Sequence, residues 1–499
     1  MSQDDDDDPS SAVAPEIAVA GNPEVFEPPH SWTLAVNTAM LTALRLVSSL
    51  AALALNWTIA RRGAGDLGSF RTVFVFFTIA ESLLLFGMQS YLFREISLHR
   101  KQVLKYAGHG LVLASVASLF AAGALIALAH GGAYSRNIST GLWIILFSLP
   151  ASAANLCALC VFVGLEKSRW YALIQTVETI VRTGVGIALL YLGWGIMSVI
   201  AVFVACRWMI QLVNLWVLAP YVRGDCWTWD GAFFRKFLSH VPTFAGITIM
   251  ALVIGAGAQV MLPWIRDDRT AGEFSAAAVF VDLVLMVPSA FVTNLVPRFA
   301  LYARESIDRL SASCRFAMTI TAAGIVPIVI GTMVMAGPLI DLVYRHNPAY
   351  LPSVPILQIS IWICLLRGID QVLSSALVAS GRQNLDFLTL SIGSSVMVTV
   401  SYVLIHRDGA IGAAVGLVSG TGALLVTRFF LVCRHLPGLN PFVLFWRLAV
   451  GAAVMLLVMH AAGSLTWWLN GICGATSYVL TILALGFARG LVEVRHHHL

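Results

Sequence analysis

The chain has 499 residues, of which 58% are hydrophobic and 11% are charged, so it is far too apolar for a soluble globular protein. The formal net charge of +5 comes from basic residues spread over many short segments, which favours contact with anionic membrane lipids and excludes a nucleic-acid-binding module. The 8 cysteines are scattered and form no disulfide framework. These features predict a polytopic membrane protein.

Residues 1–30 are acidic and contain proline, and they include the aspartate run Asp4 to Asp8. A segment of this composition cannot bury enough apolar surface to fold, so we expect a disordered, solvated cytoplasmic tail. The first apolar run starts near residue 32, behind this acidic segment. In a cleavable signal peptide a short basic segment precedes the apolar region. Here the preceding segment is acidic, so no cleavable signal peptide is predicted.

Apolar runs of about 20 residues recur along the chain, and this length crosses about 30 Å of hydrocarbon as a helix. The sequence therefore predicts an all-α membrane protein with about 14 transmembrane helices. We expect an N-terminal six-helix lobe at 31–220, an interfacial linker at 221–237, a C-terminal six-helix lobe at 238–435, and two extra helices with a short cytoplasmic tail at 436–499. The expected spans are 33–59, 69–93, 104–129, 139–164, 171–193, 196–218, 236–264, 271–297, 314–336, 353–379, 385–405, 409–432, 441–462 and 467–488.

A repeat supports the two lobes. Three residues that bracket the second span recur 204 residues later around the eighth span, and these two spans run in the same predicted direction. Such an offset is typical of a parallel repeat of six helices. The matched residues are Gly68 with Gly272, Phe70 with Phe274, and Arg94 with Arg298.

The distribution of Lys and Arg over the loops predicts the orientation. With the N-terminus inside, the inner loops and tail hold 18 of the 31 basic residues and the outer loops hold 8. This count assigns Arg428 to an inner loop and Arg71 to an outer loop. Both termini are therefore expected in the cytoplasm.

Five arginines remain inside the predicted spans. Arg447 lies near the end of its helix and can reach the interface, whereas Arg45, Arg182, Arg207 and Arg367 lie near mid-span. A central arginine costs about 2.5–3.5 kcal/mol on insertion scales, so we expect these side chains to face the interior of the bundle.

Four acids lie at similar depth and leave two interpretations open. Glu178 with Arg182, and Arg367 with Asp370, are three or four residues apart on one helix, so each pair can simply neutralise itself. Alternatively the charges line a transport pathway. The mid-span acids are Glu81, Glu178, Asp282 and Asp370.

Polar neighbours at helical spacing favour the pathway. Asn56 shares a face with Arg45, Gln211 with Arg207, and Gln371 with Arg367, while Gln89 lies two turns from Glu81. Every mid-span cation is an arginine, whose planar fork of donors suits phosphate. The predicted cavity thus suits an anionic substrate, and the four acids are either counter-ions or sites that couple transport to H⁺ or Na⁺.

Several stretches resemble the polysaccharide flippases of the Wzx type, a branch of the multidrug/oligosaccharidyl-lipid/polysaccharide exporter superfamily. The resemblance covers nearly the whole chain after the tail. It is carried by Ala60-Arg61-Arg62-Gly63, Asp66-Leu67-Gly68-Ser69-Phe70, Gly87, Gln89, Leu92-Phe93-Arg94-Glu95-Ile96, Ser353 to Gln358, Ser380-Gly381-Arg382 and Gly409 to Ala414.

The resemblance implies two six-helix lobes in a V, with two further helices, in the bacterial inner membrane. It implies that the chain moves a polyprenyl-diphosphate-linked oligosaccharide to the outer leaflet for surface polysaccharide, including lipopolysaccharide, by alternating access. The implied partners are this substrate, membrane lipids and polysaccharide assembly proteins, with no cofactor and no enzymatic activity.

Two rival functions remain. A cation-coupled drug exporter of the same superfamily would share the fold, although four mid-span arginines repel a cationic drug; the early signature of the related lipid II flippases is not seen. A polysaccharide polymerase or ligase usually has an extended outer loop, whereas here the longest, 337–351, is short and has no acid–base pair. Cys157 and Cys160 are interpreted as packing residues, and His496 to His498 as a tail.

Overall fold

The computed structural model describes residues 31–100, 102–222, 226–344, 347–436, 441–463 and 466–485. Every secondary-structure element in these residues is a helix, which confirms the all-α prediction. Ten of the described segments are long and apolar enough to cross a membrane, and the other four predicted spans coincide with further described helices. The predicted N-terminal tail and the C-terminal histidines lie outside the described residues.

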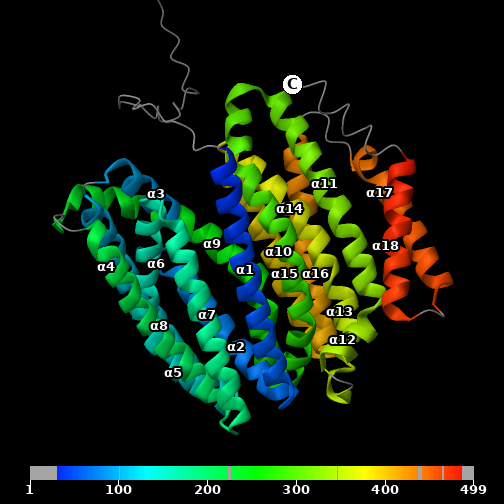
Figure 1. Ribbon diagram of the computed structural model, residues 1–499, viewed down its shortest axis with the longest axis horizontal. Helices are drawn as coiled ribbons and strands as arrows, with labels where there is room; N and C mark the ends of the chain where they lie inside the picture. Colours follow the sequence, from blue (N-terminus) through cyan, green and yellow to red (C-terminus); the bar gives the residue numbers. More distant parts are fainter. Residues whose placement is uncertain are drawn as a thin grey trace, which may run out of the picture.

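The helices form two groups that lean apart toward the ends carrying α3 and the α10–α11 turn, with a helical pair at one edge (Figure 1). The first group comprises α1 (Ser31–Ala60), α2 (Ala64–Leu83), α3 (Gln89–Leu98), α4 (Val103–His130), α5 (Arg136–Ile145), α6 (Leu149–Gly164), α7 (Ser168–Tyr191) and α8 (Ile196–Leu218). The second comprises α9 (Gly231–Ile265), α10 (Asp268–Glu305), α11 (Ile307–Val334), α12 (Ala336–Tyr344), α13 (Ser353–Ser360), α14 (Trp362–Ala379), α15 (Gln383–Asp408) and α16 (Ala410–Cys433). The edge pair is α17 (Pro441–Ala461) and α18 (Trp467–Ala484), of which α17 packs on α11.

Three predicted spans are each built from two helices. In the second span, Phe86 and Gly87 have φ of 47° and 74°, and this left-handed backbone ends α2 and starts α3. The 3₁₀ turn η1 (Leu146–Ser148) divides the fourth span, and a break at Ile361 divides the tenth. The long outer loop, 337–351, is also largely helical, since it holds most of α12 and η3 (Pro348–Tyr350).

The two groups meet where α2 and α10 begin. A side chain at Gly68 would overlap the backbone carbonyl of Asp268, and one at Gly272 would overlap the carbonyl of Ala64. These contacts are related by the 204-residue offset of the repeat, because Ala64 corresponds to Asp268 as Gly68 corresponds to Gly272. The repeated glycines therefore mark a symmetric crossing at which two helix backbones touch.

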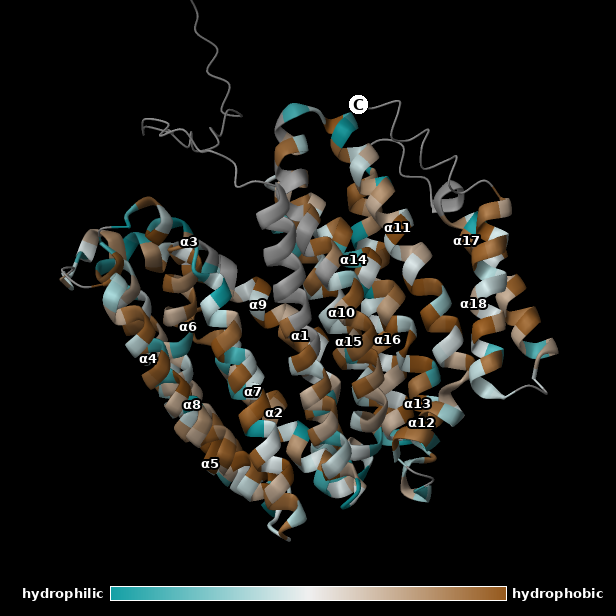
Figure 2. Cartoon of the chain, in the orientation of Figure 1, coloured by the Kyte–Doolittle hydropathy of each residue, from teal (hydrophilic) through white to brown (hydrophobic). Residues whose placement is uncertain are grey.

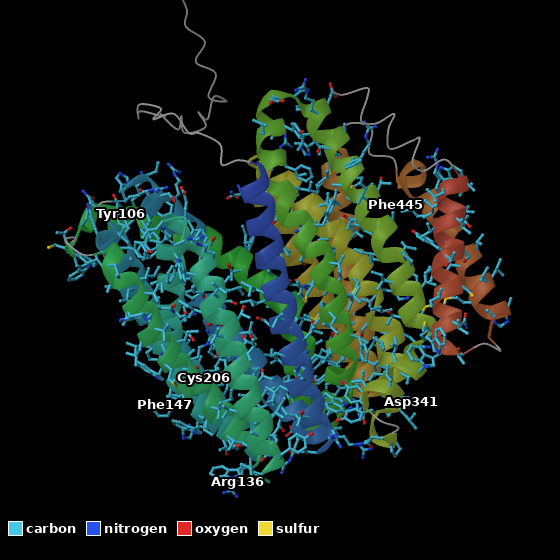
Figure 3. The ribbon with its side chains drawn as sticks, viewed as in Figure 1. Tyr106, Arg136, Phe147, Cys206, Asp341 and Phe445 are labelled. Atoms are coloured by element: carbon cyan, nitrogen blue, oxygen red, sulfur yellow. The ribbon has the colours of Figure 1, made fainter. Side chains whose placement is uncertain are left out.

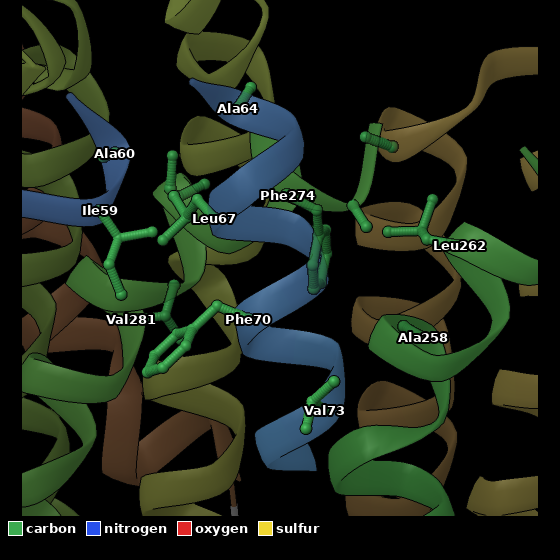
Figure 4. Packing of buried hydrophobic residues seen from close by; sticks show 14 of the residues in the cluster. Ile59, Ala60, Ala64, Leu67, Phe70, Val73, Ala258, Leu262, Phe274 and Val281 are labelled. Carbon is green, nitrogen blue, oxygen red and sulfur yellow. The ribbon is translucent and has the colours of Figure 1, made fainter. Parts of the chain in front are cut away.

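Apolar side chains from both groups surround this crossing (Figure 4). Leu67 is fully buried, and the repeat-related Phe70 and Phe274 are each 5% exposed. Ala258 and Leu262 of α9 complete the cluster. Burying so much apolar surface between the groups stabilises their approach at this end.

Hydrogen bonds reinforce the same end. The Asp268 carboxylate accepts from Ser69 Oγ at 2.6 Å and from Ser135 Oγ at 2.5 Å, so two residues of the first group converge on one acid of the second. The Tyr350 hydroxyl donates to the carbonyl oxygen of Ala60 at 2.8 Å. We call this contact region, from the starts of α2 and α10 to Tyr350, the closed end.

Helix α9 belongs to both groups. Its first turns place Phe237, which is fully buried, in the core of the first group, whereas Ile254 packs against α15 and α16 of the second. Pro242 lies between these parts and removes one backbone hydrogen bond. Among the described residues of the predicted linker 221–237, those outside any helix are therefore 222 and 226–230.

Asp230 anchors the start of α9. Its side chain accepts from the backbone N–H of Phe233 and pairs with Lys105 Nζ at 2.8 Å, while its own N–H donates to His109 Nε2 at 3.0 Å. The hydrogen bond from Lys105 lowers the pKa of the Asp230 carboxyl. The linker is thus fixed to α4 of the first group at several points.

The outer faces of the helices are apolar (Figure 2). Leu119, Phe120 and Trp216 are 73%, 77% and 78% exposed, on α4 and α8. Exposure of this kind suits lipid, because a soluble protein rarely presents such a contiguous apolar face.

Candidate functional site

Arg207 of α8 forms an ion pair with Glu81 of α2, with 3.2 Å between Nη2 and Oε1. The guanidinium also lies over the rings of Phe77 and Phe203. Its Nε is buried and has no hydrogen-bond partner. The arginine is therefore neutralised by one acid but keeps an unused donor, and Glu81 is occupied by Arg207.

Arg182 of α7 lies against the same Phe203 ring, 5.0 Å from its centroid. Its nearest acid is Glu178, one turn earlier on α7, with 3.7 Å between Nε and Oε1. That distance is too long for a hydrogen bond, and both atoms are buried without a partner. The structure thus brings Arg182 and Arg207 together around one aromatic ring, with an acid beside each.

A layer of amides lies on α6, α7 and α8 next to these arginines. Asn155 accepts from Gln175 Nε2 and from Asn214 Nδ2, both at 2.9 Å. Gln211 is 7% exposed, and its Oε1 has no partner. Gln211 also lines an apolar cavity of about 410 Å³ between α4, α6 and α8.

Arg367 of α14 lies in the second group, beside Gly255 of α9. The side chain is partly exposed and makes no hydrogen bond or ion pair within the described residues. Asp370 and Asp282 are its nearest charged groups. Its full set of donors is therefore available.

Asp370 does not pair with Arg367, because Arg428 of α16 holds it. Arg428 donates to Asp370 Oδ1 at 2.5 Å, to Asp386 Oδ1 at 2.8 Å and to Thr389 Oγ1 at 3.2 Å. Asp386 accepts also from Ser374 Oγ at 2.9 Å. Arg428 is 1% exposed, so its assignment to an inner loop was wrong: its charge is compensated by two acids, which permits burial.

Asp282 of α10 also has an arginine partner. Arg71 Nη2 of α2 lies 2.8 Å from Asp282 Oδ2, and this pair joins the two groups of helices. Arg71 was assigned to an outer loop, but it lies two turns inside α2. The sequence analysis identified Asp282 as a mid-span acid but did not predict that Arg71 is its partner.

The remaining predicted site residues are placed as follows. The Arg45 backbone is in α1, but its side chain lies outside the described residues. Asn56 Nδ2 donates to the Ala52 carbonyl at 2.8 Å, and Gln371 Nε2 donates to Ser289 Oγ at 3.2 Å, whereas the side-chain oxygen of each has no partner. Gln89 is the first residue of α3 and makes no side-chain hydrogen bond in the described structure.

Taken together, the described mid-span charges form a cluster in the first group, a chain of charges in the second, and one pair between them. Each of the four predicted acids contacts an arginine, whereas the arginines retain donors without partners. An unused guanidinium donor inside a membrane protein can bind an anion. No cluster of residues suited to a metal ion occurs in the part of the chain that was searched.

Solved structures of transporters share this fold. The lipid II flippase MurJ, in an inward closed conformation, matches with a TM-score of 0.76 and 15% identity over 91% of this chain and 100% of that one. An inward-facing multidrug resistance MATE family transporter matches with a TM-score of 0.64 and 14% identity, over 80% and 98%. The Vibrio cholerae MATE transporter VcmN, in its bent form, matches with 0.56 and 16%, over 81% and 98%.

Sequence comparisons identify the family. No curated protein matches the chain. A family model described as a polysaccharide biosynthesis protein matches residues 63–355, more than half of the chain. The chain therefore belongs to this family of polysaccharide biosynthesis proteins.

Proposed function

We propose that the chain is a flippase that moves a polyprenyl-diphosphate-linked oligosaccharide from the inner to the outer leaflet of the bacterial inner membrane. The observation that carries this function is a set of unused guanidinium donors inside a fold shared with a lipid II flippase. Nε of Arg182 and Nε of Arg207 have no hydrogen-bond partner in the described structure, and Arg367 makes no hydrogen bond or ion pair within the described residues. These donors suit the diphosphate, whose charge cannot cross a bilayer unaided.

Alternating access would let the substrate reach this site from one side of the membrane and leave it on the other. The groups are held together at the closed end and lean apart at the other (Figure 1). Given cytoplasmic termini, that other end faces the cytoplasm, where the lipid-linked substrate would enter. Exchange of the closed and open ends would then release it to the outer leaflet, for polysaccharide assembly proteins to use.

The rival exporter function is less well supported. A drug/cation exporter needs an acid free to bind its cation, whereas Glu81, Glu178, Asp282 and Asp370 each have an arginine beside them. We propose that Glu81, Glu178 and Asp282 are counter-ions which bind H⁺ or Na⁺ only after a phosphate has taken the arginine, whereas Asp370 stays paired with Arg428. The function proposed is transport without an enzymatic step.

Transport by purified protein tests the proposal. In proteoliposomes that contain a fluorescent lipid-linked oligosaccharide, we expect Arg182→Gln, Arg207→Gln and Arg367→Gln each to slow flipping by about tenfold or more, because each removes a charge-assisted contact. Arg269→Gln is the matched control, since the Arg269 side chain is 66% exposed at the surface. Normal flipping by the three variants, or loss of protein without loss of specific activity, would reject the site.

A further inference from the structure

The ion pair between Arg71 and Asp282 joins α2 of the first group to α10 of the second, with 2.8 Å between the charged atoms. The two side chains differ in accessibility, since Arg71 is 24% exposed and Asp282 is 61% exposed. The carboxylate is thus the less enclosed member of the pair and can leave more easily than the guanidinium. The Arg71 guanidinium is more enclosed than the carboxylate, so we expect it to stay in place when Asp282 leaves.

A cavity of about 200 Å³ lies beside this pair. Two polar atoms of its lining residues are buried without a hydrogen-bond partner, Nε of Arg71 and Oδ1 of Asn56. They leave one donor and one acceptor unused on residues that line a space large enough for a small anion. Buried polar atoms of this kind cost free energy unless a ligand or water satisfies them. The other lining residues are Ser49, Ala52, Leu53, Val279, Asp282, Leu283 and Met286.

We propose that Arg71 is a phosphoryl-binding residue, and that a phosphoryl group of the substrate replaces Asp282 on its guanidinium. The proposal rests on the flippase function proposed above. A phosphoryl oxygen can accept from both Nη2, now used by Asp282, and Nε, now unused, which a guanidinium offers as a fork. The unused oxygen of Asn56 is available to a hydroxyl of the attached sugar or to water.

The exchange would leave no carboxylate isolated. Asp282 lies within electrostatic range of Arg367, so it keeps a cation nearby after it leaves Arg71. The charge that the substrate brings is compensated by Arg71 in the same step. The exchange is therefore feasible in a membrane protein, where an unpaired buried charge would not be tolerated.

Its position links the exchange to the movement of the two groups. Arg71 lies less than one turn after Gly68, at which α2 touches the backbone of α10. Loss of the Arg71–Asp282 pair removes an attraction across this crossing at the moment the anion binds. The anion would bind more tightly when the closed end is open, because Arg71 is then free of Asp282. Its binding therefore shifts the equilibrium toward the open arrangement.

The experiment measures the closed end directly. Spin labels at Arg136→Cys of α5 and Leu342→Cys of α12, in a Cys226→Ser background that removes the exposed thiol, report the distance between the two groups there. The full chain in nanodiscs is titrated separately with a polyprenyl diphosphate and with inorganic pyrophosphate. The first arm presents the anion on a lipid and the second presents it free, so the arms distinguish the two sources.

Four results are expected. In the parent, the lipid diphosphate lengthens the distance. Arg71→Gln weakens its binding by about tenfold to a hundredfold and abolishes the lengthening. Asp282→Asn lengthens the distance without ligand and binds the lipid diphosphate at least as tightly, because its competitor for Arg71 is gone. Arg269→Gln, on the exposed surface of α10, behaves like the parent.

The proposal is overturned if Arg71→Gln responds like the parent, or if Asp282→Asn binds the lipid diphosphate more weakly. It is overturned as well if neither ligand changes the distance in the parent. Failure of the parent to flip a lipid-linked oligosaccharide would instead reject the proposed function, because the distance and binding measurements do not require transport.

Discussion

At Arg428, a single guanidinium neutralises two carboxylates, Asp370 and Asp386, that belong to two other helices. The three side chains are 1%, 7% and 4% exposed, so the charges depend on one another for compensation. Their hydrogen bonds tie α14, α15 and α16 together. We regard Arg428 as a structural residue, in contrast to Arg367, which makes no hydrogen bond or ion pair within the described residues.

Removing Arg428 should destabilise the protein strongly. Arg428→Met leaves two buried acids without their ion-pair partner, and breaking such a network costs about 3–5 kcal/mol. The triple variant Arg428→Met, Asp370→Asn, Asp386→Asn should recover much of this loss, because no uncompensated charge remains. Unfolding in detergent measures both, and equal stability of Arg428→Met and the parent would contradict the structural role.

The sequence indicated the buried residue types more reliably than their partners. Glu178 and Arg182 contact each other as their four-residue spacing suggested. Asp370 instead pairs with Arg428, 58 residues later, and Arg71 with Asp282, 211 residues later. Such pairs depend on which helices pack together, and this cannot be predicted from the spacing of residues along one helix. Arg428 follows an apolar run near the end of a predicted span. An arginine there can extend its side chain to the membrane interface, so the sequence did not indicate that Arg428 is buried.

Among the elements, the α2–α10 crossing permits the sharpest test. Gly68→Ala places a methyl group against the backbone of α10, and a backbone cannot rotate away as a side chain can. We expect the closed-end distance between labels at Arg136→Cys and Leu342→Cys to lengthen, and the free energy of unfolding to fall by about 1–3 kcal/mol.

Gly65→Ala provides the matched control. Gly65 lies on the same helix less than one turn earlier, and nothing lies within 4 Å of the position that its methyl group would take. This variant should keep the parental distance. If Gly68→Ala also keeps it, the two backbones do not meet there as described.

Helix positions were predictable because apolar runs of bilayer length have few other interpretations. All fourteen predicted spans contain described helix. The break at Ile361 was not predictable, since Ile361 is neither a proline nor a glycine. The break in the second span does include a glycine, Gly87, but a single glycine does not by itself predict where a helix ends. The repeat was visible in three residue pairs, but only the structure shows that Gly68 and Gly272 touch across a symmetric crossing.

For the whole molecule, the two ends of the helices carry different chemistry and are expected on different sides of the membrane. Tyr106 and Arg136 mark opposite ends of the first group (Figure 3). Leu98, near Tyr106, is 64% exposed, and Arg136 is exposed at the start of α5. Both positions are accessible to a thiol reagent after replacement by cysteine.

Labelling from one side tests the orientation. In spheroplasts, a membrane-impermeant maleimide should label Arg136→Cys without permeabilisation and Leu98→Cys only after it, in the Cys226→Ser background. The reason is the excess of Lys and Arg on the loops next to Leu98. The opposite pattern would reverse the predicted topology and place the closed end in the cytoplasm.

The shared helix α9 has a consequence for how the chain is made. Synthesis delivers the first group before Phe237 has left the ribosome, and Phe237 is a fully buried part of that group's core. The first repeat is therefore incomplete until the opening turns of the second repeat emerge, and it cannot finish folding independently. A gene split in the linker before Gly231 would separate Phe237 from the core it fills, although the repeat boundary suggests cutting there.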